Sequence, residues 1–243
     1  MAPTLVLLHG FTNTGASWDG VVDAVGKRYR PLAPDIRGHG TASPVTPVDL
    51  ASVIADVSAL TEPTETFTLV GYSMGGRLAL HVAFAHAPRV DRLVLIGASP
   101  GLQTPAERAA RITADERLAG EIEAMTIEAF AARWAQTPVL ADQPAHIRAA
   151  VDADRRRNTP HGLASALRGL GTGALPSLWD RLPALAIPVD LIVGEHDQKF
   201  RATAERMAAA LPAARLHVVA GAGHAVHLED PAAVAAIIAG TSR

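Results

Sequence analysis

The sequence predicts an α/β fold in which a mostly parallel β-sheet is flanked by helices. Three observations support this prediction. Short apolar runs rich in Val, Leu and Ile recur along the chain, as expected of strands that are buried on both faces. Amphipathic stretches with helical spacing separate these runs, which is typical of parallel strands joined by crossover helices. One apolar run passes at Gly71 through a glycine-rich turn directly into a helical segment.

The elements can be assigned in order. Strands are expected at residues 4–8, 30–34, 66–70, 92–96, 187–193 and 215–219. Helices are expected at 17–29 with Ser17 as its N-cap, at 47–60, 74–86 and 203–211, and from Pro231 onwards. Between residues 103 and 180 we find only helical patterns, rich in Ala, Arg and Glu. We therefore expect a core formed by residues 1–102 and 181–243, with a helical cap inserted at 103–180.

The composition limits the classes of function. The chain has 243 residues, a formal net charge of -2 and no cysteine. Such a charge creates no field that would recruit nucleic acid or a membrane surface, so we expect neither as a partner. The lack of thiols excludes disulfides, thiolate catalysis and cysteine-bound metals. The N-terminal segment has neither a basic leader nor a long apolar core, and we expect a cytoplasmic protein.

The turn at residues 71–75, Gly-Tyr-Ser-Met-Gly, matches the G-x-S-x-G pattern of a serine nucleophile held between a strand and a helix. Glycines are needed there because a Cβ atom would crowd the backbone of so sharp a turn. The helix that begins after Ser73 places free N–H groups and positive dipole potential near the hydroxyl. Since this short pattern also occurs by chance, it requires an acid and then a histidine later in the chain.

Both residues are present, and each follows an expected strand. Asp197 comes after the strand at 187–193, and His224 comes after the strand at 215–219. Because parallel strands end at one edge of a sheet, both side chains are expected beside Ser73. The order serine, acid, histidine is that of the α/β-hydrolase fold. In this triad His224 would accept the serine proton, and Asp197 would orient and stabilise the imidazolium.

Two backbone N–H groups are expected to form an oxyanion hole. In the α/β-hydrolase fold one belongs to the residue after the nucleophile, which is Met74 here. The other comes from the loop after an early strand, where the sequence reads His9-Gly10-Phe11, so Phe11 is the expected donor. The alternative is that His9 and Gly10 merely terminate the strand.

Other polar residues have simpler interpretations. The segment 38–40, Gly-His-Gly, follows a strand but matches no phosphate-binding pattern, so we reject nucleotide binding. We interpret His39 as structural or solvent-facing, and His217 and His227 as core or supporting groups. The acidic loop around His196 lacks further ligands at the spacing of a metal site. We therefore expect no metal and no cofactor.

Several segments outside the nucleophile turn are distinctive. Together with that turn they are GYSMGGR at 71–77, GASPGL at 97–102, ERAAR at 107–111, the run from Phe130 to Leu140, RRRNTPHGLASALRGLGTG from Arg155, PSLW at 176–179 and GEHDQKF at 194–200. In these segments the sequence resembles the MenH family, the 2-succinyl-6-hydroxy-2,4-cyclohexadiene-1-carboxylate synthases of menaquinone biosynthesis. They cover the nucleophile turn, the cap and the acid loop. One departure is that the segment after His224 lacks the polar residue that some MenH-like enzymes carry beside this histidine.

The resemblance implies a lyase. Such enzymes remove a carbon-bound proton from 2-succinyl-5-enolpyruvyl-6-hydroxy-3-cyclohexene-1-carboxylate and eliminate pyruvate without an acyl-enzyme. Ser73, deprotonated by His224, would be the base, and the oxyanion N–H groups would hold an enolate-like oxygen. The implied partner is a small polycarboxylate, and no obligate protein partner is evident. The alternative is a carboxylesterase or C–C bond hydrolase that uses the same triad through an acyl-enzyme.

A substrate with three carboxylates requires positive charge that cannot be lost by deprotonation. Arginine supplies it in a planar fork that matches a carboxylate. The resemblance implies a set of substrate-binding residues: Tyr72, Arg77, Arg111, Trp134, Arg155 and Lys199.

The sequence alone allows other interpretations of the arginines. Arg77 could lie on a helix surface, and Arg111 could form an i,i+4 pair with Glu107. Arg155 could be one member of the solvated run 155–157. Which of the three adjacent arginines faces the site depends on the register of the helix.

Overall fold

The computed structural model describes residues 2–137 and 143–240. Among these residues a six-stranded sheet has the order β2-β1-β3-β4-β5-β6, and every neighbouring pair is parallel. The strands are β1 (Thr4–Leu8), β2 (Arg30–Leu32), β3 (Phe67–Tyr72), β4 (Val90–Ile96), β5 (Val189–Gly194) and β6 (Ala214–Val219). Each of the six expected strands is therefore present, with small shifts at the ends.

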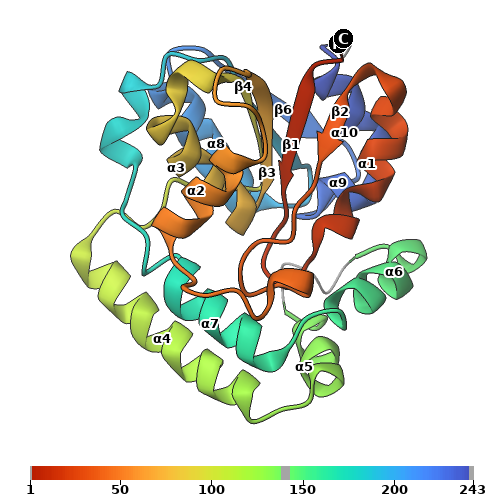
Figure 1. Ribbon diagram of the computed structural model, residues 1–243, viewed down its shortest axis with the longest axis vertical. Coiled ribbons are helices and arrows are strands. Elements are labelled where there is room, and N and C mark those ends of the chain that lie inside the picture. The colour runs from red at the N-terminus through yellow and green to blue at the C-terminus, as the bar shows by residue number, and fades with distance from the viewer. Residues whose placement is uncertain (1, 138–142, 241–243) are drawn as a thin grey trace.

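Helices cover both faces of the sheet (Figure 1). One layer contains α2 (Leu50–Ala59), α3 (Met74–Ala85) and α8 (Gln198–Ala210), and the other contains α1 (Asp19–Val25) and α10 (Pro231–Ile238). Successive side chains of a strand point to opposite faces. Leu69 of β3 accordingly packs into the first layer and Val70 into the second. This double burial explains why the strands are continuous apolar runs.

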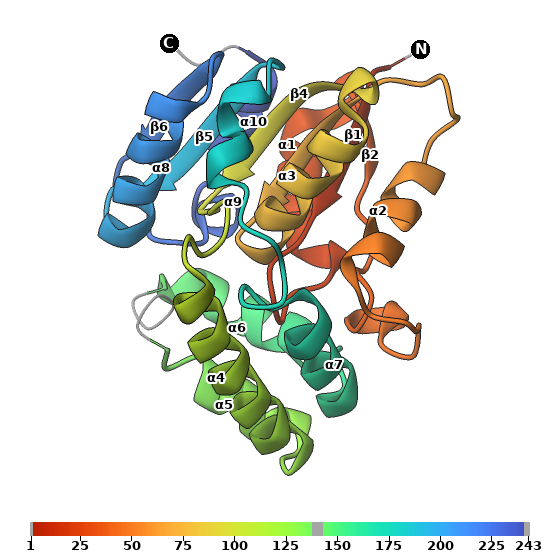
Figure 2. The same cartoon turned by 90° about the vertical axis from the view of Figure 1, so that its left-hand side faces the viewer.

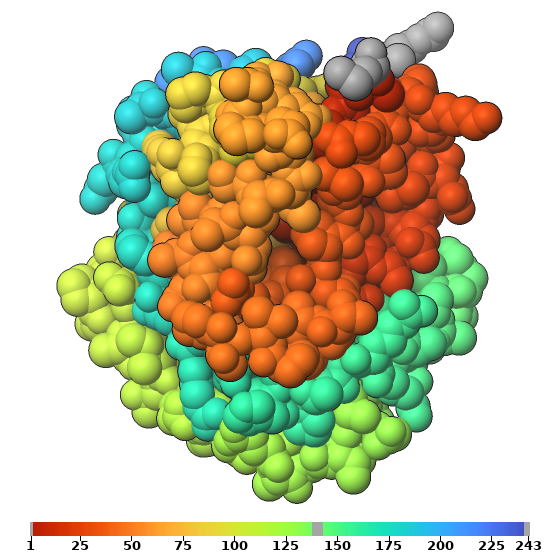
Figure 3. Space-filling model, viewed as in Figure 1, coloured from red at the N-terminus to blue at the C-terminus, as the bar shows by residue number. Residues whose placement is uncertain are grey.

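The cap consists of four helices between β4 and β5. They are α4 (Pro105–Glu123), α5 (Ile127–Trp134), α6 (Ala145–Arg155) and α7 (Pro160–Leu170). They gather at the end of the sheet away from the described N-terminal residues (Figure 2), and Figure 3 shows them, yellow-green to green, against the core. A separate apolar cluster that includes Ile122, Phe130 and Leu163 holds α4, α5 and α7 together.

The expected fold class, a parallel sheet flanked by helices with an inserted helical cap, is confirmed. The boundaries of core and cap stay a prediction, and a 3₁₀ helix at Trp179–Ala184 spans the expected boundary at residue 180. Pro138 and the end of the family segment at Leu140 lie outside the described residues. Of the helices within the described ranges, none is both long and apolar enough to cross a membrane.

The helix expected at 17–29 is broken into three pieces, so that prediction was wrong in detail. A 3₁₀ turn at Gly15–Trp18 is capped by the hydroxyl of Thr14, not by Ser17. The α-helix α1 follows, and a second 3₁₀ turn at Gly26–Arg28 completes the segment. Gly26 has a φ of 58°, a left-handed conformation that ends α1 and that glycine adopts at little cost.

Helices α2 and α8 begin at capping carboxylates. Asp49 accepts a hydrogen bond from the N–H of Ser52, so α2 begins at residue 50 and not at 47. Asp197 accepts one from the N–H of Phe200, and α8 therefore begins directly after it. The short helix α9 (Val226–Glu229) was not expected from the sequence.

The Gly75→Ala variant should lose about 1–3 kcal/mol of unfolding free energy, measured by urea denaturation. A Cβ at residue 75 would lie 2.2 Å from the carbonyl oxygen of Leu8 and 2.5 Å from that of His9, so α3 would be forced away from β1. Gly120→Ala is the matched control, because a Cβ at this helical glycine meets nothing within 4 Å. It should gain about 0.5–1 kcal/mol. Equal effects of the two changes would show that close packing is not the reason for glycine at residue 75.

Candidate active site

Ser73 occupies the sharp turn between β3 and α3. Its φ of 51° and ψ of -107° are rare for a residue with a side chain. Strained residues of this kind persist where the surroundings hold them, and they cluster at functional sites. The N–H of Ser73 donates to the carbonyl of Ile96 at 2.9 Å, which ties the turn to β4. A Cβ at Gly71 would lie 2.4 Å from the carbonyl oxygen of Gly75, so the glycine is required sterically.

The structure brings Ser73, His224 and Asp197 together from the ends of three strands. His224 Nε2 lies 3.2 Å from Ser73 Oγ, and His224 Nδ1 lies 2.6 Å from Asp197 Oδ2. If Nδ1 carries the proton and donates it to the carboxylate, Nε2 is free to accept the serine proton. Asp197 and His224 are buried, which strengthens the interaction between them. The arrangement can therefore generate a reactive serine oxygen.

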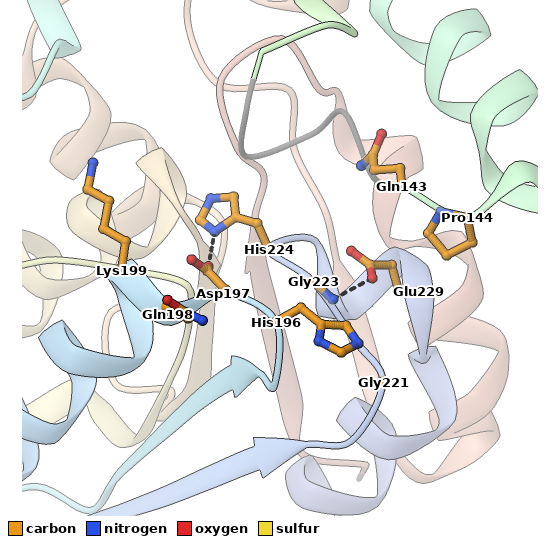
Figure 4. A pocket seen from close by; sticks show the side chains of 10 residues that line it. All are labelled: Gln143, Pro144, His196, Asp197, Gln198, Lys199, Gly221, Gly223, His224 and Glu229. Atoms are coloured by element: carbon orange, nitrogen blue, oxygen red, sulfur yellow. Dashed lines mark hydrogen bonds and ion pairs between the residues drawn. The ribbon is translucent and has the colours of Figure 1, made fainter.

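The loop that carries His224 is held by a carboxylate that the sequence analysis did not single out. Glu229 accepts hydrogen bonds from the N–H of Gly223 at 2.6 Å and from the N–H of Ala225 at 3.0 Å, one on each side of the histidine. Figure 4 shows Glu229 facing Gly223. The only signal for this role in the sequence is that an acidic residue, Glu229, follows His224 within the short segment that forms α9. Glu229 thus fixes the backbone of this loop from the next helical turn.

Two aromatic rings flank the imidazole of His224. The ring of Phe200 lies 4.5 Å from it and the ring of Tyr72 lies 5.2 Å from it, both between centroids. Tyr72 also packs at 4.2 Å on the ring of His227. Its hydroxyl is buried, and burial raises the pKa of Tyr72 well above its usual value. Tyr72 therefore stays neutral, and it presents an apolar ring with one hydroxyl group to its surroundings.

The two expected oxyanion donors come from two different elements. Met74 is the first residue of α3, where backbone N–H groups have no acceptor within the helix. Phe11 follows β1, and its ring packs edge-on against His39 at 5.7 Å and Trp134 at 5.3 Å. The following residue, Thr12, has a φ of 71°, so the loop turns sharply at this point.

His9 is fully buried and holds two chain segments in place. Its Nε2 accepts the N–H of Ile36 at 2.9 Å, and its Nδ1 donates to the carbonyl of Gly10 at 2.9 Å. Both bonds need a neutral ring, and burial lowers the pKa of His9. His9 therefore does more than terminate β1, because it fixes the loop that leads to Phe11.

Arg77 points from α3 toward the cap. Its Nη2 lies 3.5 Å from the carbonyl oxygen of Leu170 in α7, and its Nε is buried without a hydrogen-bond partner among the described residues. Burial, followed by repulsion from Arg111, lowers the pKa of Arg77 to about 10. The guanidinium is therefore charged at neutral pH. A desolvated cation with an unused donor is suited to an anionic ligand.

Arg111 is half-exposed and pairs within α4. Its Nε lies 2.7 Å from Asp115 Oδ1, while the other carboxylate oxygen of Asp115 has no partner within the described ranges. The alternative interpretation, an i,i+4 pair with Glu107, is therefore wrong. Glu107 instead closes a capping box with Thr104 at the start of α4. The geometry leaves Arg111 beside Arg77, with Asp115 as an acidic neighbour of both.

Among the three adjacent arginines only Arg155 points inward. It is 4% exposed, and its Nε is buried without a partner in the described part of the chain. Arg156 binds Asp152 at 2.7 Å on the surface, and Arg157 is exposed. Burial lowers the pKa of Arg155, and interaction with Tyr72 opposes this effect. The helical register that the sequence left open therefore favours Arg155.

The other two expected substrate-binding residues lie in different surroundings. Trp134 is half-buried, and its ring packs at 5.3 Å on Phe11 and at 5.5 Å on Phe130. Lys199 is exposed, with Nζ 5.5 Å from the centre of the Phe200 ring. Together with Asp197 it lines a cavity of about 260 Å³ on the acid side of the imidazole (Figure 4). Trp134 thus lies beside the loop of Phe11, whereas Lys199 lies beside the triad acid.

Three other histidines that the sequence singled out have structural positions. His39 is 0% exposed, so the solvent-facing interpretation was wrong; its ring packs on His9 at 5.0 Å. His217 Nε2 lies 2.7 Å from the buried carboxylate of Asp190. His227 is buried between the rings of Trp18 and Tyr72. No group of three or more potential metal-ligating side chains occurs in residues 2–137 and 143–240.

Comparisons with known proteins agree with this geometry. Residues 5–237 match the alpha/beta hydrolase family. The 2-succinyl-6-hydroxy-2,4-cyclohexadiene-1-carboxylate synthase of Salmonella agona (strain SL483) is 37% identical over 238 residues, which cover 96% of this chain and 91% of that protein. The chain belongs to the MenH family of alpha/beta hydrolases. The family resemblance expected from the sequence is thereby confirmed.

Further comparisons relate this MenH-family chain to another curated sequence and to solved structures. A relative from Bacillus subtilis (strain 168), which carries the same synthase name as a provisional assignment, is 40% identical over 93% of this chain and 85% of its own. The structure of MenH from S. aureus has a TM-score of 0.93 at 29% identity and covers 99% of this chain and 93% of that one. An enol-lactonase from Burkholderia xenovorans LB400 has a TM-score of 0.82 at 23% identity, covers 99% and 91%, and shows the fold alone.

The His227→Phe variant should make this MenH-family protein more tolerant of acid. Burial lowers the pKa of His227 to about 3, and its two ring nitrogens have no partner among the described residues. The native ring therefore stays neutral while the unfolded chain takes up a proton below its usual value of 6.5, so stability falls as the pH falls from that value. Below this value the variant should lose about 1.4 kcal/mol less per pH unit than the wild type.

Urea denaturation at a series of pH values measures this difference. Above the usual histidine pKa the ring is neutral in both states, so the two proteins should differ there by a pH-independent amount of up to about 1–3 kcal/mol, because the phenyl ring is larger than the imidazole that it replaces. Identical acid slopes for the two proteins would contradict the neutral buried histidine.

Proposed function

We propose that this MenH-family protein eliminates pyruvate from 2-succinyl-5-enolpyruvyl-6-hydroxy-3-cyclohexene-1-carboxylate to form 2-succinyl-6-hydroxy-2,4-cyclohexadiene-1-carboxylate in menaquinone biosynthesis. One observation carries the proposal. Arg77 and Arg155 are buried, and each has an Nε without a partner among the described residues. Arg77 lies one helical turn after Ser73, to whose carbonyl its backbone N–H donates, and Arg155 interacts with Tyr72 of the same turn. An enzyme for uncharged esters has no need of such groups, whereas a polycarboxylate supplies their missing acceptors.

The triad acts as a base in this proposal. His224 takes the proton of Ser73, held at 3.2 Å, while Asp197 stabilises the imidazolium. The serine oxygen then removes the ring proton, and the electrons of the broken C–H bond extend the ring unsaturation as the bond to the enolpyruvyl oxygen breaks. The departing pyruvate enolate regains a proton, which the imidazolium can supply. No bond forms between substrate and serine, so the alkoxide is used only for proton transfer.

The electrostatics of the site suit this reaction. Removal of a carbon-bound proton develops negative charge on a conjugated oxygen, and the N–H groups of Phe11 and Met74 are our proposed donors to it. Arg77 and Arg155 neutralise carboxylates of the substrate, and Arg111, released from Asp115, adds a third cation at the cap. Tyr72, Trp134 and Lys199 complete the proposed substrate-binding set.

The cap closes this site in our proposal. We assign residues 1–102 and 181–243 to the catalytic core and 103–180 to the cap, because α4 to α7 all lie within that range. The small polycarboxylate is the proposed partner, and the cytoplasm is the proposed location of the reaction.

The Ser73→Ala variant should lose kcat by about 10²- to 10⁴-fold, the usual contribution of a positioned base. Ultraviolet absorbance follows formation of the diene, and released pyruvate is measured in parallel. A variant that kept kcat within a few-fold of the wild type would remove Ser73 as the base. The wild type should also be tested on p-nitrophenyl esters, because ester turnover that far exceeded pyruvate release would favour the hydrolase.

Arg155→Ala should raise KM about 30-fold or more, since a charged hydrogen bond in a desolvated site contributes about 2 kcal/mol or more. Arg156→Ala is the matched control, because the neighbouring side chain forms only a surface pair with Asp152. The control should keep the wild-type KM. If Arg156→Ala had the larger effect, our assignment of the inward-facing arginine would be wrong.

A further inference from the structure

The cap reaches across to the loop of Phe11 through a buried carboxylate. Asp154 of α6 is 7% exposed, and it accepts hydrogen bonds from three groups of this loop. They are the N–H of Thr14 at 3.0 Å, the hydroxyl of Thr14 at close range, and the side-chain amide of Asn13 at 3.3 Å. An ionised carboxylate can accept several such bonds, so Asp154 is matched to the donors around it.

A second buried side chain of the cap holds the same loop. Asn158 is 4% exposed, and its amide N–H₂ donates to the carbonyl of Thr12 at 2.9 Å and to the carbonyl of Arg155 at 2.9 Å. Its amide oxygen accepts the N–H of Gly40 at 3.0 Å. Both donors of the amide are used, which fixes its orientation. Asn158 thus joins the cap to two core loops at once.

The loop needs this support because its backbone is strained. Thr12 has a φ of 71°, a conformation that costs a residue with a side chain about 1–3 kcal/mol and persists only where neighbouring contacts hold it. Within the loop, the N–H of Asn13 donates to the carbonyl of Gly10 at 3.1 Å. The bonds from Asp154 and Asn158 fall on Thr12 and the two residues that follow it. Phe11, the proposed oxyanion donor, directly precedes the strained residue.

We propose that Asp154 and Asn158 are positioning residues of the cap that, through the loop, hold the N–H of Phe11 in the orientation that the oxyanion hole requires. Arg155, which we assign to a substrate carboxylate, lies between them in the same short segment, 154–158. Because the same segment carries Arg155 and the bonds that hold the loop of Phe11, it links the bound carboxylate to the oxyanion hole. The inference rests on the proposed function, because the kcat that we use as a readout is that of pyruvate elimination. It adds to that function a link between carboxylate binding and the oxyanion hole.

The test uses two nearly isosteric variants and a control on the same helix. The Asp154→Asn variant places an NH₂ group, itself a donor, where the loop groups need an acceptor. The Asn158→Asp variant removes the N–H that donates to the carbonyl of Thr12. Asp152→Asn is the control, because Asp152 is a surface residue that binds Arg156. We expect each of the first two variants to lower kcat about 10- to 100-fold, below the 10²–10³ for outright loss of an oxyanion donor. KM should stay within about threefold of the wild type because Arg155 is retained.

A second readout does not depend on the lyase reaction. Diisopropyl fluorophosphate labels an activated serine: the bond from Ser73 Oγ to phosphorus forms, fluoride leaves, and His224 takes the proton. Its phosphoryl oxygen occupies the oxyanion hole, so the labelling rate reports the position of these N–H groups. The two variants should slow labelling by a factor similar to the loss of kcat, and Asp152→Asn should label at the wild-type rate.

The outcomes separate this inference from the proposed function. A wild type that labels normally but releases no pyruvate would overturn the proposed lyase, while slower labelling of the two variants would still support the positioning role. Wild-type kcat and labelling rates in both variants would overturn the positioning role and leave the lyase intact. A higher KM with unchanged kcat would also overturn the positioning role, because it would indicate a role in binding. A lower melting temperature with unchanged labelling of the folded protein would overturn it as well, because it would indicate a purely structural role.

Discussion

The constraint on which the site depends is that all strands of a parallel sheet end at the same edge. Ser73, Asp197 and His224 follow three different strands, yet their side chains meet within hydrogen-bonding distance. The sharp turn at Ser73 adds a second condition, since α3 must approach β1 so closely that only glycine fits at residue 75. Packing of the apolar core therefore places the three triad groups.

The positive charge of the proposed site is divided between core and cap. In our proposal the core supplies the triad and Arg77, whereas the cap supplies Arg111 and Arg155. The buried cations have unsatisfied N–H groups, which is unfavourable in the absence of an anion and favourable once one binds. Asp115 binds Arg111 through one oxygen and lies near Arg77, so it would compete with a substrate carboxylate at these two arginines.

The sequence predicted the strands, the cap and the candidate triad because each follows from local patterns or from their order along the chain. It failed where local caps override the apolar spacing and where distant partners decide. The segment at 15–28 breaks because Thr14 and Gly26 impose local caps, which the apolar spacing concealed. Among the adjacent arginines only tertiary packing distinguishes Arg155. The bonds of Asp154 and Asn158 to the loop of Phe11 join residues about 140 positions apart, and no periodicity reveals them.

Helix α7 lies against the core with almost no side-chain layer between them. A Cβ at Gly162 would come within 2.6 Å of the carbonyl oxygen of Gly38, and one at Gly169 within 1.7 Å of that of Val48. Two backbones in such contact cannot slide or roll past each other without collision. Helix α7 and the loop at 38–48 therefore form one packed unit. Because α4 and α5 share an apolar cluster with α7, they are joined to this unit, whereas α6 contributes no residue to that cluster.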